Sequence, residues 1–162
     1  MTQVGVRRRE ESDRHAVEAF LDERSALLVA RLGRLERALE HPALLAERDG
    51  ALRGVLTFVL GDGDCEILTL HAADRFSGIG TALVEAVERL AAEAGCSRLW
   101  AITTNDNTDA LRFYQRRGFR LAALHRGAVD HSRTELKPEI PPIGDHGIDL
   151  RDELELEKVP NP

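Results

Sequence analysis

A change of hydrophobic period around a glycine-bearing turn constrains the fold most strongly. Residues 67–70 form an apolar run typical of a strand, and the apolar residues after the turn recur at intervals of three and four. These residues are Ile79, Ala82, Leu83, Ala86, Val87, Leu90, Ala91 and Ala94. The spacing predicts one face of a helix over residues 79–94, ended by Gly95. Because residues 98–104 then predict a strand, we expect a right-handed crossover between parallel strands.

The turn itself has the pattern Arg-x-x-Gly-x-Gly, formed by Arg75, Phe76, Ser77, Gly78, Ile79 and Gly80. A glycine turn that opens a helix after a strand presents backbone N–H groups at the positive end of the helix dipole, which favours a diphosphate. A dinucleotide fingerprint would need a third glycine where Leu83 stands, and a P-loop would need Gly-Lys-Ser/Thr. The turn alone therefore predicts a phosphate ligand without identifying it.

The first half of the chain predicts a strand, a helix and an antiparallel meander. Residues 4–8 alternate as a short strand, and Ser12 or Asp13 can cap a helix that runs through about Asp22. Residues 25–40 are interpreted as helix-rich, with residues 28–31 as an extended alternative. Two strands, at 44–47 and 52–60, flank the turn dipeptide Asp49-Gly50 as a β-hairpin, and a strand at 65–70 follows.

The second half continues with alternating elements. Asn105, Asp106 and Asn107 offer caps for a helix over 108–117, which Gly118 closes. We expect a strand at 119–125, one or two helical turns at 129–135, and a proline-rich loop at 137–147. Residues 153–157 alternate glutamate and leucine, which predicts a one-sided strand at or near a sheet edge. Together these elements predict one mixed domain over residues 1–162, with helices on both faces of a sheet.

Composition narrows the functional classes. From Glu139 to the end there are seven acids and two bases, so most of the net charge of −6 belongs to the tail, and no basic surface for nucleic acid is expected. No apolar run is long enough to span a membrane, and residues 2–6 lack a signal-peptide core. Cys65 and Cys96 are interpreted as reduced thiols, which favours the cytoplasm. The six histidines show no metal-site spacing, so we expect no metal.

A second segment identifies the phosphate ligand by resemblance. Residues 107–119 read Asn-Thr-Asp-Ala-Leu-Arg-Phe-Tyr-Gln-Arg-Arg-Gly-Phe, and together with Arg75-x-x-Gly78-x-Gly80 they resemble the GNAT superfamily of N-acetyltransferases over residues 66–119. The resemblance implies a mostly antiparallel, splayed α/β sheet with one parallel strand-helix-strand crossover. Acetyl-CoA would lie where the strands at 65–70 and 99–104 part. The motif core would be residues 65–119, followed by a C-terminal loop and strand at 127–158.

The resemblance also assigns binding roles to residues of this chain. The backbone of the turn would cradle the CoA pyrophosphate, and the backbone of one strand would pair with the pantetheine arm like an added strand. The helix at 108–117, which follows the strand at 99–104, would contact the pantetheine arm and line the site around the thioester. The implied residues are Arg75, Phe76, Ser77, Gly78, Ile79, Gly80 and Thr81 for the turn, Leu68, Thr69 and Leu70 for the strand, and Asn107, Ala110 and Phe113 for the helix.

Two catalytic roles follow. Tyr114 would be the general acid that protonates the departing CoA thiolate, since a phenol is protonated at neutral pH. The first candidate for the general base is Glu66, because strand alternation would place it on one face with Leu68 and Leu70. His71 is the second candidate, and His41 the third.

The expected function is an N-acetyltransferase that moves the acetyl group of acetyl-CoA to an amine of a small molecule or peptide, by direct attack in a ternary complex. The alternative is a non-catalytic acyl-CoA-binding or sensor domain of the same fold. Arg31, Arg133 and Lys137 could hold a carboxylate-bearing acceptor. We expect no nucleic-acid or membrane partner, while the alternating tail strand would allow a homodimer.

Overall fold

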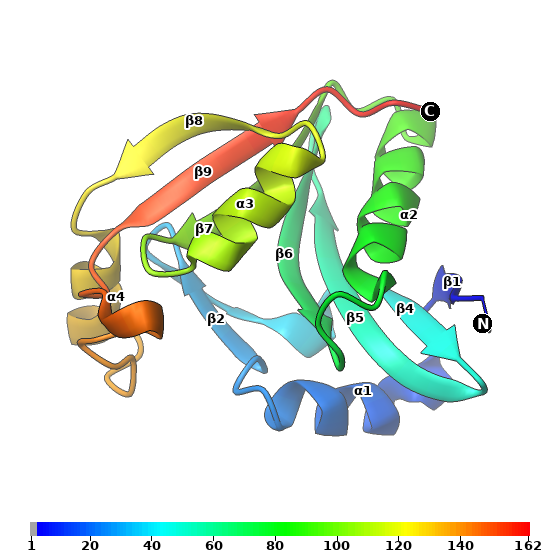
Figure 1. Cartoon of the computed structure of the whole chain (residues 1–162), viewed down its shortest axis with the longest axis horizontal. Helices are drawn as coiled ribbons and strands as arrows, with labels where there is room; N and C mark the ends of the chain where they lie inside the picture. The colour runs from blue at the N-terminus through cyan, green and yellow to red at the C-terminus, as the bar shows by residue number, and fades with distance from the viewer. Residues whose placement is uncertain (1–2) are drawn as a thin grey trace. The chain divides into compact units, whose positions relative to one another are not determined.

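The computed structural model describes residues 3–162 (Figure 1). These residues form two compact units. The N-terminal unit comprises the residues up to Leu28, Arg37–Leu99 and Pro160–Pro162, and the C-terminal unit comprises Val29–Glu36 and Trp100–Val159. The helices are α1 (Arg14–Asp22), α2 (Ile79–Glu93), α3 (Thr108–Arg116) and α4 (Ala128–Glu135). The strands are β1 (Gly5–Arg8), β2 (Leu28–Arg31), β3 (Arg34–Arg37), β4 (Ala43–Arg48), β5 (Ala51–Leu60), β6 (Asp64–Ala72), β7 (Arg98–Thr104), β8 (Arg120–His125) and β9 (Glu153–Lys158).

The N-terminal unit is built on antiparallel strands in the order β1-β4-β5-β6. Its β4–β5 hairpin turns at Asp49 and Gly50, which both have positive φ (54° and 75°) as a two-residue hairpin requires. The first residues of β7, Arg98 and Leu99, belong to this unit, where β7 follows β6 in the strand order as its parallel neighbour. The mixed, mostly antiparallel fold with one crossover is therefore confirmed.

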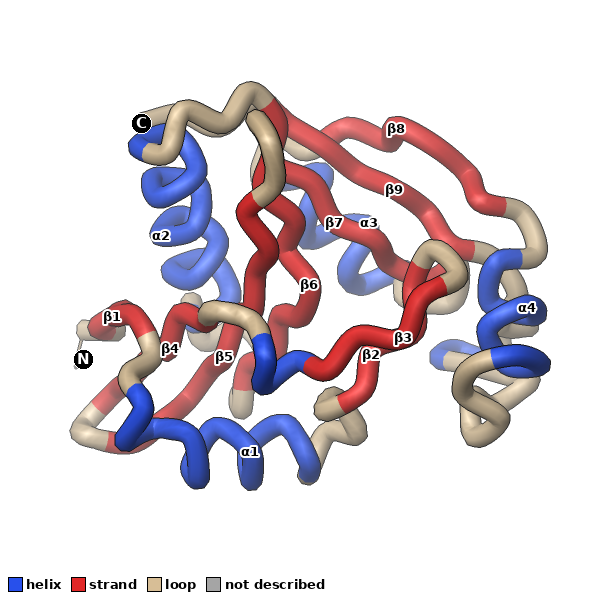
Figure 2. Tube along the Cα trace, turned by 180° about the vertical axis from the view of Figure 1, so that it is seen from behind, coloured by secondary structure: helices blue, strands red, loops and turns tan. Residues whose placement is uncertain are grey.

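Helices cover both faces of these strands, which explains why β4 and β5 are buried at successive positions (Figure 2). Val55 of β5 packs in a core with three residues of α1, namely Val17, Phe20 and Leu21. The preceding residue, Gly54, points the opposite way, against α2. Strand alternation therefore gives α1 one face of the sheet and α2 the other.

The C-terminal unit places β9 between β7 and β8, so the edge strand is β8 and the predicted tail strand lies next to it. The strand was expected to be one-sided, but Glu153 is 1% exposed. Its carboxylate accepts a hydrogen bond of 2.9 Å from the backbone N–H of Leu32, in the turn between β2 and β3. The turn of the β2–β3 hairpin thus contacts the first residue of β9. Burial raises the pKa of Glu153.

The helix-rich interpretation of residues 25–40 is wrong, and its extended alternative at residues 28–31 is confirmed. Strands β2 and β3 pair as a separate two-stranded sheet, followed by a single 3₁₀ turn at Ala38–Glu40. The reason is the turn at Leu32 and Gly33, where both residues have positive φ (49° and 73°). This geometry belongs to tight hairpins and interrupts a helix, although the surrounding residues have good helix propensity.

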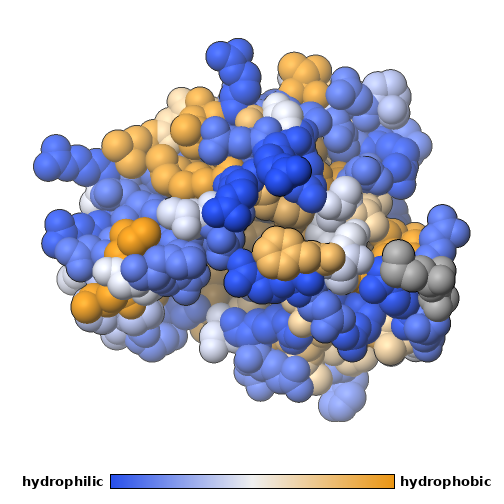
Figure 3. All heavy atoms as spheres, in the orientation of Figure 1, coloured by the Kyte–Doolittle hydropathy of each residue, from blue (hydrophilic) through white to orange (hydrophobic). Residues whose placement is uncertain are grey.

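Most of the surface in Figure 3 is hydrophilic, with hydrophobic side chains in scattered groups. Exposed large apolar residues include Leu121 and Leu124 of β8, and Phe76 in the turn before α2. Among residues 3–162, no helix is long and apolar enough to cross a bilayer. Cys65 and Cys96 are free thiols, and burial raises the pKa of Cys65 to about 12.

The close approach of α2 to β5 predicts that Gly54→Ala destabilises the protein. A β-carbon at Gly54 would collide with Cγ2 of Ile79 and stand 3.0 Å from Cδ1 of Leu83. Overpacking of this kind costs about 1–3 kcal/mol in the free energy of unfolding, measurable by urea denaturation. Gly5→Ala is the matched control, because no atom lies within 4 Å of its β-carbon position. Equal stability of the two variants would contradict the packing argument.

Candidate functional site

The turn between β6 and α2 has the geometry of an anion-binding loop. Gly78 is the N-cap of α2 and has a φ of 84°, a conformation that favours glycine. The first bond of the helix runs from the N–H of Ala82 to the carbonyl of Gly78. The N–H groups of Ile79 and Gly80 precede that bond, so they have no partner inside the helix. The first turn of α2 also carries no acid, which leaves the positive end of its dipole uncompensated.

Two arginines of the β4–β5 hairpin hold this turn in place. Arg48 donates a hydrogen bond of 2.9 Å from Nη2 to the carbonyl of Ser77, and Arg53 pairs with the carboxylate of Asp74. The hydroxyl of Ser77 donates to the carbonyl of Asp74 at 2.7 Å, which closes the turn on itself. The turn therefore has a fixed shape before any ligand arrives, and Arg48 brings positive charge near it.

A β-bulge in β6 changes which of the predicted residues share a face. Thr69 pairs with Thr57 of β5 and Ile67 pairs with Phe58, so Leu68 is an extra residue without a partner in β5. The bulge interrupts the alternation of side chains along β6. Glu66 consequently lies on the opposite face from Leu70, and the expectation that Glu66, Leu68 and Leu70 share a face is wrong.

Glu66 instead shares its face with Thr69 and His71, because their partners on β5 are Val59, Thr57 and Val55. This is the face that α1 covers. The two threonine hydroxyls lie 2.7 Å apart and are buried, and Glu66 is only 3% exposed.

The two leading candidates for the general base therefore flank one buried hydroxyl pair. His71 is half-buried at the far end of this row. Burial, with a smaller contribution from the positive charge of Arg24, lowers the pKa of His71, so the imidazole is neutral at neutral pH.

In the C-terminal unit, the predicted helix begins at the predicted cap. Oδ1 of Asn107 accepts a hydrogen bond of 3.0 Å from the N–H of Ala110, which satisfies one donor of the first turn of α3. Ala110 and Phe113 are both half-buried. The spacing of Asn107, Ala110 and Tyr114 places all three on one face of α3.

Tyr114 is the buried centre of an aromatic cluster. Its ring makes edge-to-face contacts with Phe113 and Phe119, at centroid distances of 5.4 and 5.1 Å. The guanidinium of Arg117 lies 3.6 Å from the ring centre of Phe113 and donates to that residue's carbonyl. Burial raises the pKa of Tyr114 above its ordinary value of 10.0, so the phenol keeps its proton throughout the neutral range.

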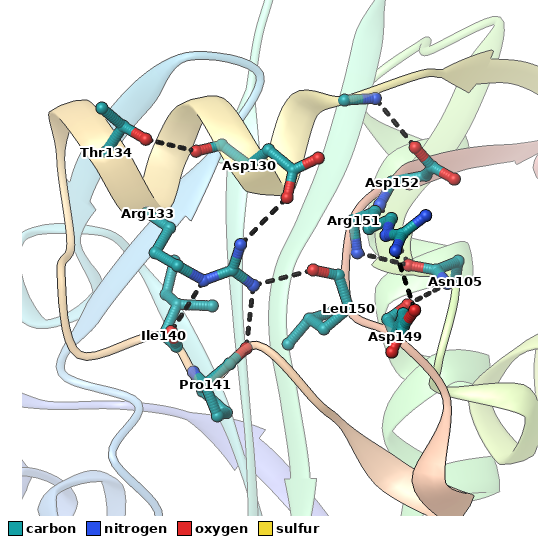
Figure 4. A network of polar contacts seen from close by, with 11 residues as sticks. Asn105, Asp130, Arg133, Thr134, Ile140, Pro141, Asp149, Leu150, Arg151 and Asp152 are labelled. Carbon is teal, nitrogen blue, oxygen red and sulfur yellow. Dashed lines mark hydrogen bonds and ion pairs between the residues drawn. The ribbon is translucent and has the colours of Figure 1, made fainter.

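The segment between α4 and β9 is ordered by Arg133 (Figure 4). Its guanidinium donates to the carbonyls of Ile140, Pro141 and Leu150 and to the carboxylate of Asp130, at 2.7–3.0 Å. This set of bonds occupies nearly all of its donors. The expectation that Arg133 binds a carboxylate-bearing acceptor is therefore wrong. Arg31 also has a protein partner, since its Nη1 lies 3.8 Å from Oε1 of Glu36.

Two residues that the sequence suggested only as alternative caps serve a different purpose. Oδ1 of Asn105 accepts from the N–H groups of Arg151 and Asp152, and its amide nitrogen donates to the carbonyl of Asp149. Asp106, 6% exposed, accepts from the N–H of Asp145 at 2.9 Å. Both side chains therefore fasten the same C-terminal segment to the start of α3. Asx residues before a helix predict a cap, and only the tertiary structure distinguishes which of them is used.

The comparisons with known proteins agree with this geometry. The sequence profile of the acetyltransferase (GNAT) family matches residues 7–119. The chain is 46% identical over 110 residues to YdhI, an uncharacterized protein of Bacillus subtilis (strain 168), and the match covers 68% of each chain.

Two solved structures resemble it over nearly their whole length. An IAA acetyltransferase from Bacillus cereus ATCC 14579 has a TM-score of 0.74 at 21% identity, covering 97% of this chain and 99% of its own. A GNAT family acetyltransferase from Elizabethkingia anophelis with acetyl-CoA bound has a TM-score of 0.67 at 20% identity, covering 96% and 97%. At this identity the structures support the fold, while the profile and the curated relative establish the relationship. The chain belongs to the acetyltransferase (GNAT) family.

Proposed function

We propose that the protein is an acetyl-CoA-dependent N-acetyltransferase, which transfers the acetyl group to an amine of a small molecule or peptide by direct attack in a ternary complex. The observation that carries the proposal is the preformed turn before α2, in a chain of the acetyltransferase family. The amine nitrogen would form a bond to the acetyl carbon while the carbon–sulfur bond breaks. The amine loses a proton to a base, and the thiolate gains one from an acid.

The turn would bind the pyrophosphate of the acetyl donor. The N–H groups of Ile79 and Gly80 and the positive end of α2 match the charge of a diphosphate, and the left-handed Gly78 lets the backbone approach closely. The remaining turn residues proposed for binding are Arg75, Phe76, Ser77 and Thr81. The backbone of Leu68–Leu70 is proposed to pair with the pantetheine arm like an added strand.

Tyr114 is the proposed general acid, and Asn107, Ala110 and Phe113 on the same helix are proposed to contact the donor. Burial keeps the phenol protonated, which suits a group that must deliver a proton to a thiolate. The raised pKa also means that alkaline pH up to about 10 does not remove this proton.

Glu66 is the proposed base. His71 remains the second candidate, since its neutral imidazole lies on the same face.

One assay tests the function directly. Purified protein is mixed with acetyl-CoA and a panel of primary amines, and the release of free thiol is followed, with the acetylated amine identified by mass spectrometry. We expect amine-dependent thiol release. Binding of CoA by calorimetry without release for any amine would instead support a non-catalytic acyl-CoA-binding domain.

The acid role predicts that Tyr114→Phe lowers kcat about 100-fold while the affinity for CoA stays within twofold. The substitution removes only the hydroxyl and keeps the ring that packs against Phe113 and Phe119. Steady-state kinetics give kcat, and calorimetry gives the CoA affinity. In the wild-type enzyme, kcat should not fall between pH 8 and about pH 10 on account of this residue, since its raised pKa keeps it protonated. A large loss of CoA affinity in the variant would contradict the assignment.

The arginine support of the turn predicts that Arg48→Met raises KM for acetyl-CoA about tenfold, with kcat changed less than twofold. The variant loses a charge-assisted hydrogen bond to the carbonyl of Ser77, a bond of about 1.5–3 kcal/mol that orders the turn. Arg89→Met is the matched control, because Arg89 is exposed on α2, beyond its first turn. The support role fails if both variants behave like the wild type.

A further inference from the structure

Phe76 is an aromatic side chain in a position where folding gives it almost nothing to pack against. The residue is 95% exposed, and within residues 3–162 the next most exposed large apolar residue, Val159, is 73% exposed. A phenylalanine normally contributes to a fold by burying its ring, so this one contributes little to stability. The guanidinium of Arg75 lies 5.5 Å from the ring centroid, near the outer limit for a cation–π contact.

The backbone at Phe76 is also unfavourable for this residue type. Its φ is 57°, in the left-handed region that glycine and asparagine adopt far more readily than an aromatic residue does. The turn around it is fixed independently, by Arg48 on Ser77 and by Arg53 on Asp74. The ring is therefore displayed on a rigid turn and does not help to form it.

The position of Phe76 relates it to one part of the proposed donor. It stands two residues before Gly78, at whose helix terminus the pyrophosphate is proposed to bind. In CoA the pyrophosphate joins two halves, the pantetheine arm and the adenosine 3′-phosphate. Since the arm is assigned to β6, the adenosine is the half without an assigned contact. Its adenine is a flat aromatic ring, and an exposed aromatic side chain is the group that binds such a ring by stacking.

We propose that Phe76 is a specificity-determining contact of the donor site, on which the adenine of CoA stacks. This inference rests on the proposed function, because it requires the pyrophosphate to bind at the turn. Through the exposed ring of Phe76, the protein would distinguish complete CoA esters from shorter pantetheine thioesters.

The test compares two probes by calorimetry: CoA, and 4′-phosphopantetheine, which has the arm but lacks adenosine. In Phe76→Ala we expect the affinity for CoA to fall about tenfold, as for loss of one base–aromatic stack, with the affinity for 4′-phosphopantetheine unchanged. Phe76→Trp should keep or improve CoA binding. Leu121→Ala is the matched control, since Leu121 is 55% exposed on β8, and it should change neither affinity.

A further variant separates the ring from the backbone. Phe76→Asn removes the ring but favours the left-handed conformation, so it preserves the turn. We expect it to lose CoA affinity as Phe76→Ala does. Wild-type affinity in Phe76→Asn, or an equal loss for both probes in Phe76→Ala, would overturn the stacking role and leave the proposed function intact. Failure of the wild-type protein to bind CoA at all would instead refute the proposed function.

Discussion

The fixed shape of the turn before α2 is the constraint on which the donor side of the protein depends. A left-handed Gly78 directs the chain from β6 into α2, and Arg48 and Arg53 of the β4–β5 hairpin hold the turn from outside. Gly54 then lets α2 approach β5 closely. The hairpin, the helix and the turn are thus fixed by one another, so the N–H groups at the helix terminus are oriented by packing without any contribution from the ligand.

Elements with a strong period could be predicted from the sequence. The three- and four-residue spacing located α2 to within one residue, and the Asp49-Gly50 hairpin was also correct. Of the three candidate caps before α3, the structure uses Asn107. Residues 25–40 could not be assigned correctly, because their helix propensity competes with a tight turn at Leu32 and Gly33 whose stabilising partner, Glu153, is distant in sequence. Local propensity contains no information about such a contact.

In the candidate site too, features set by local sequence were predictable, and features set by distant contacts were not. Residues that act through local backbone geometry, such as Gly78 and Asn107, were identifiable from motif and capping rules. The face on which Glu66 lies was not, because one extra residue at Leu68 inverts the alternation of side chains, and no residue type signals that bulge. The structural role of Arg133 could not be predicted from the sequence either. A basic residue beside a polar loop suggests an anionic ligand, but the partners of Arg133 are mainly backbone carbonyls of the segment between α4 and β9.

The way in which Arg133 holds the α4–β9 segment has a consequence for how the protein can diversify. Apart from Asp130 within α4, its partners are main-chain oxygens, which every amino acid supplies. Asn105 and Asp106 likewise grip the backbone of this segment. Exposed side chains between positions 139 and 150 can therefore be exchanged while the path of the chain stays the same. Gly144, where a β-carbon would collide with Asp106, and the buried Leu150 are exceptions. A lineage could alter the chemistry that this stretch presents, one substitution at a time, without first having to rebuild the scaffold that supports it.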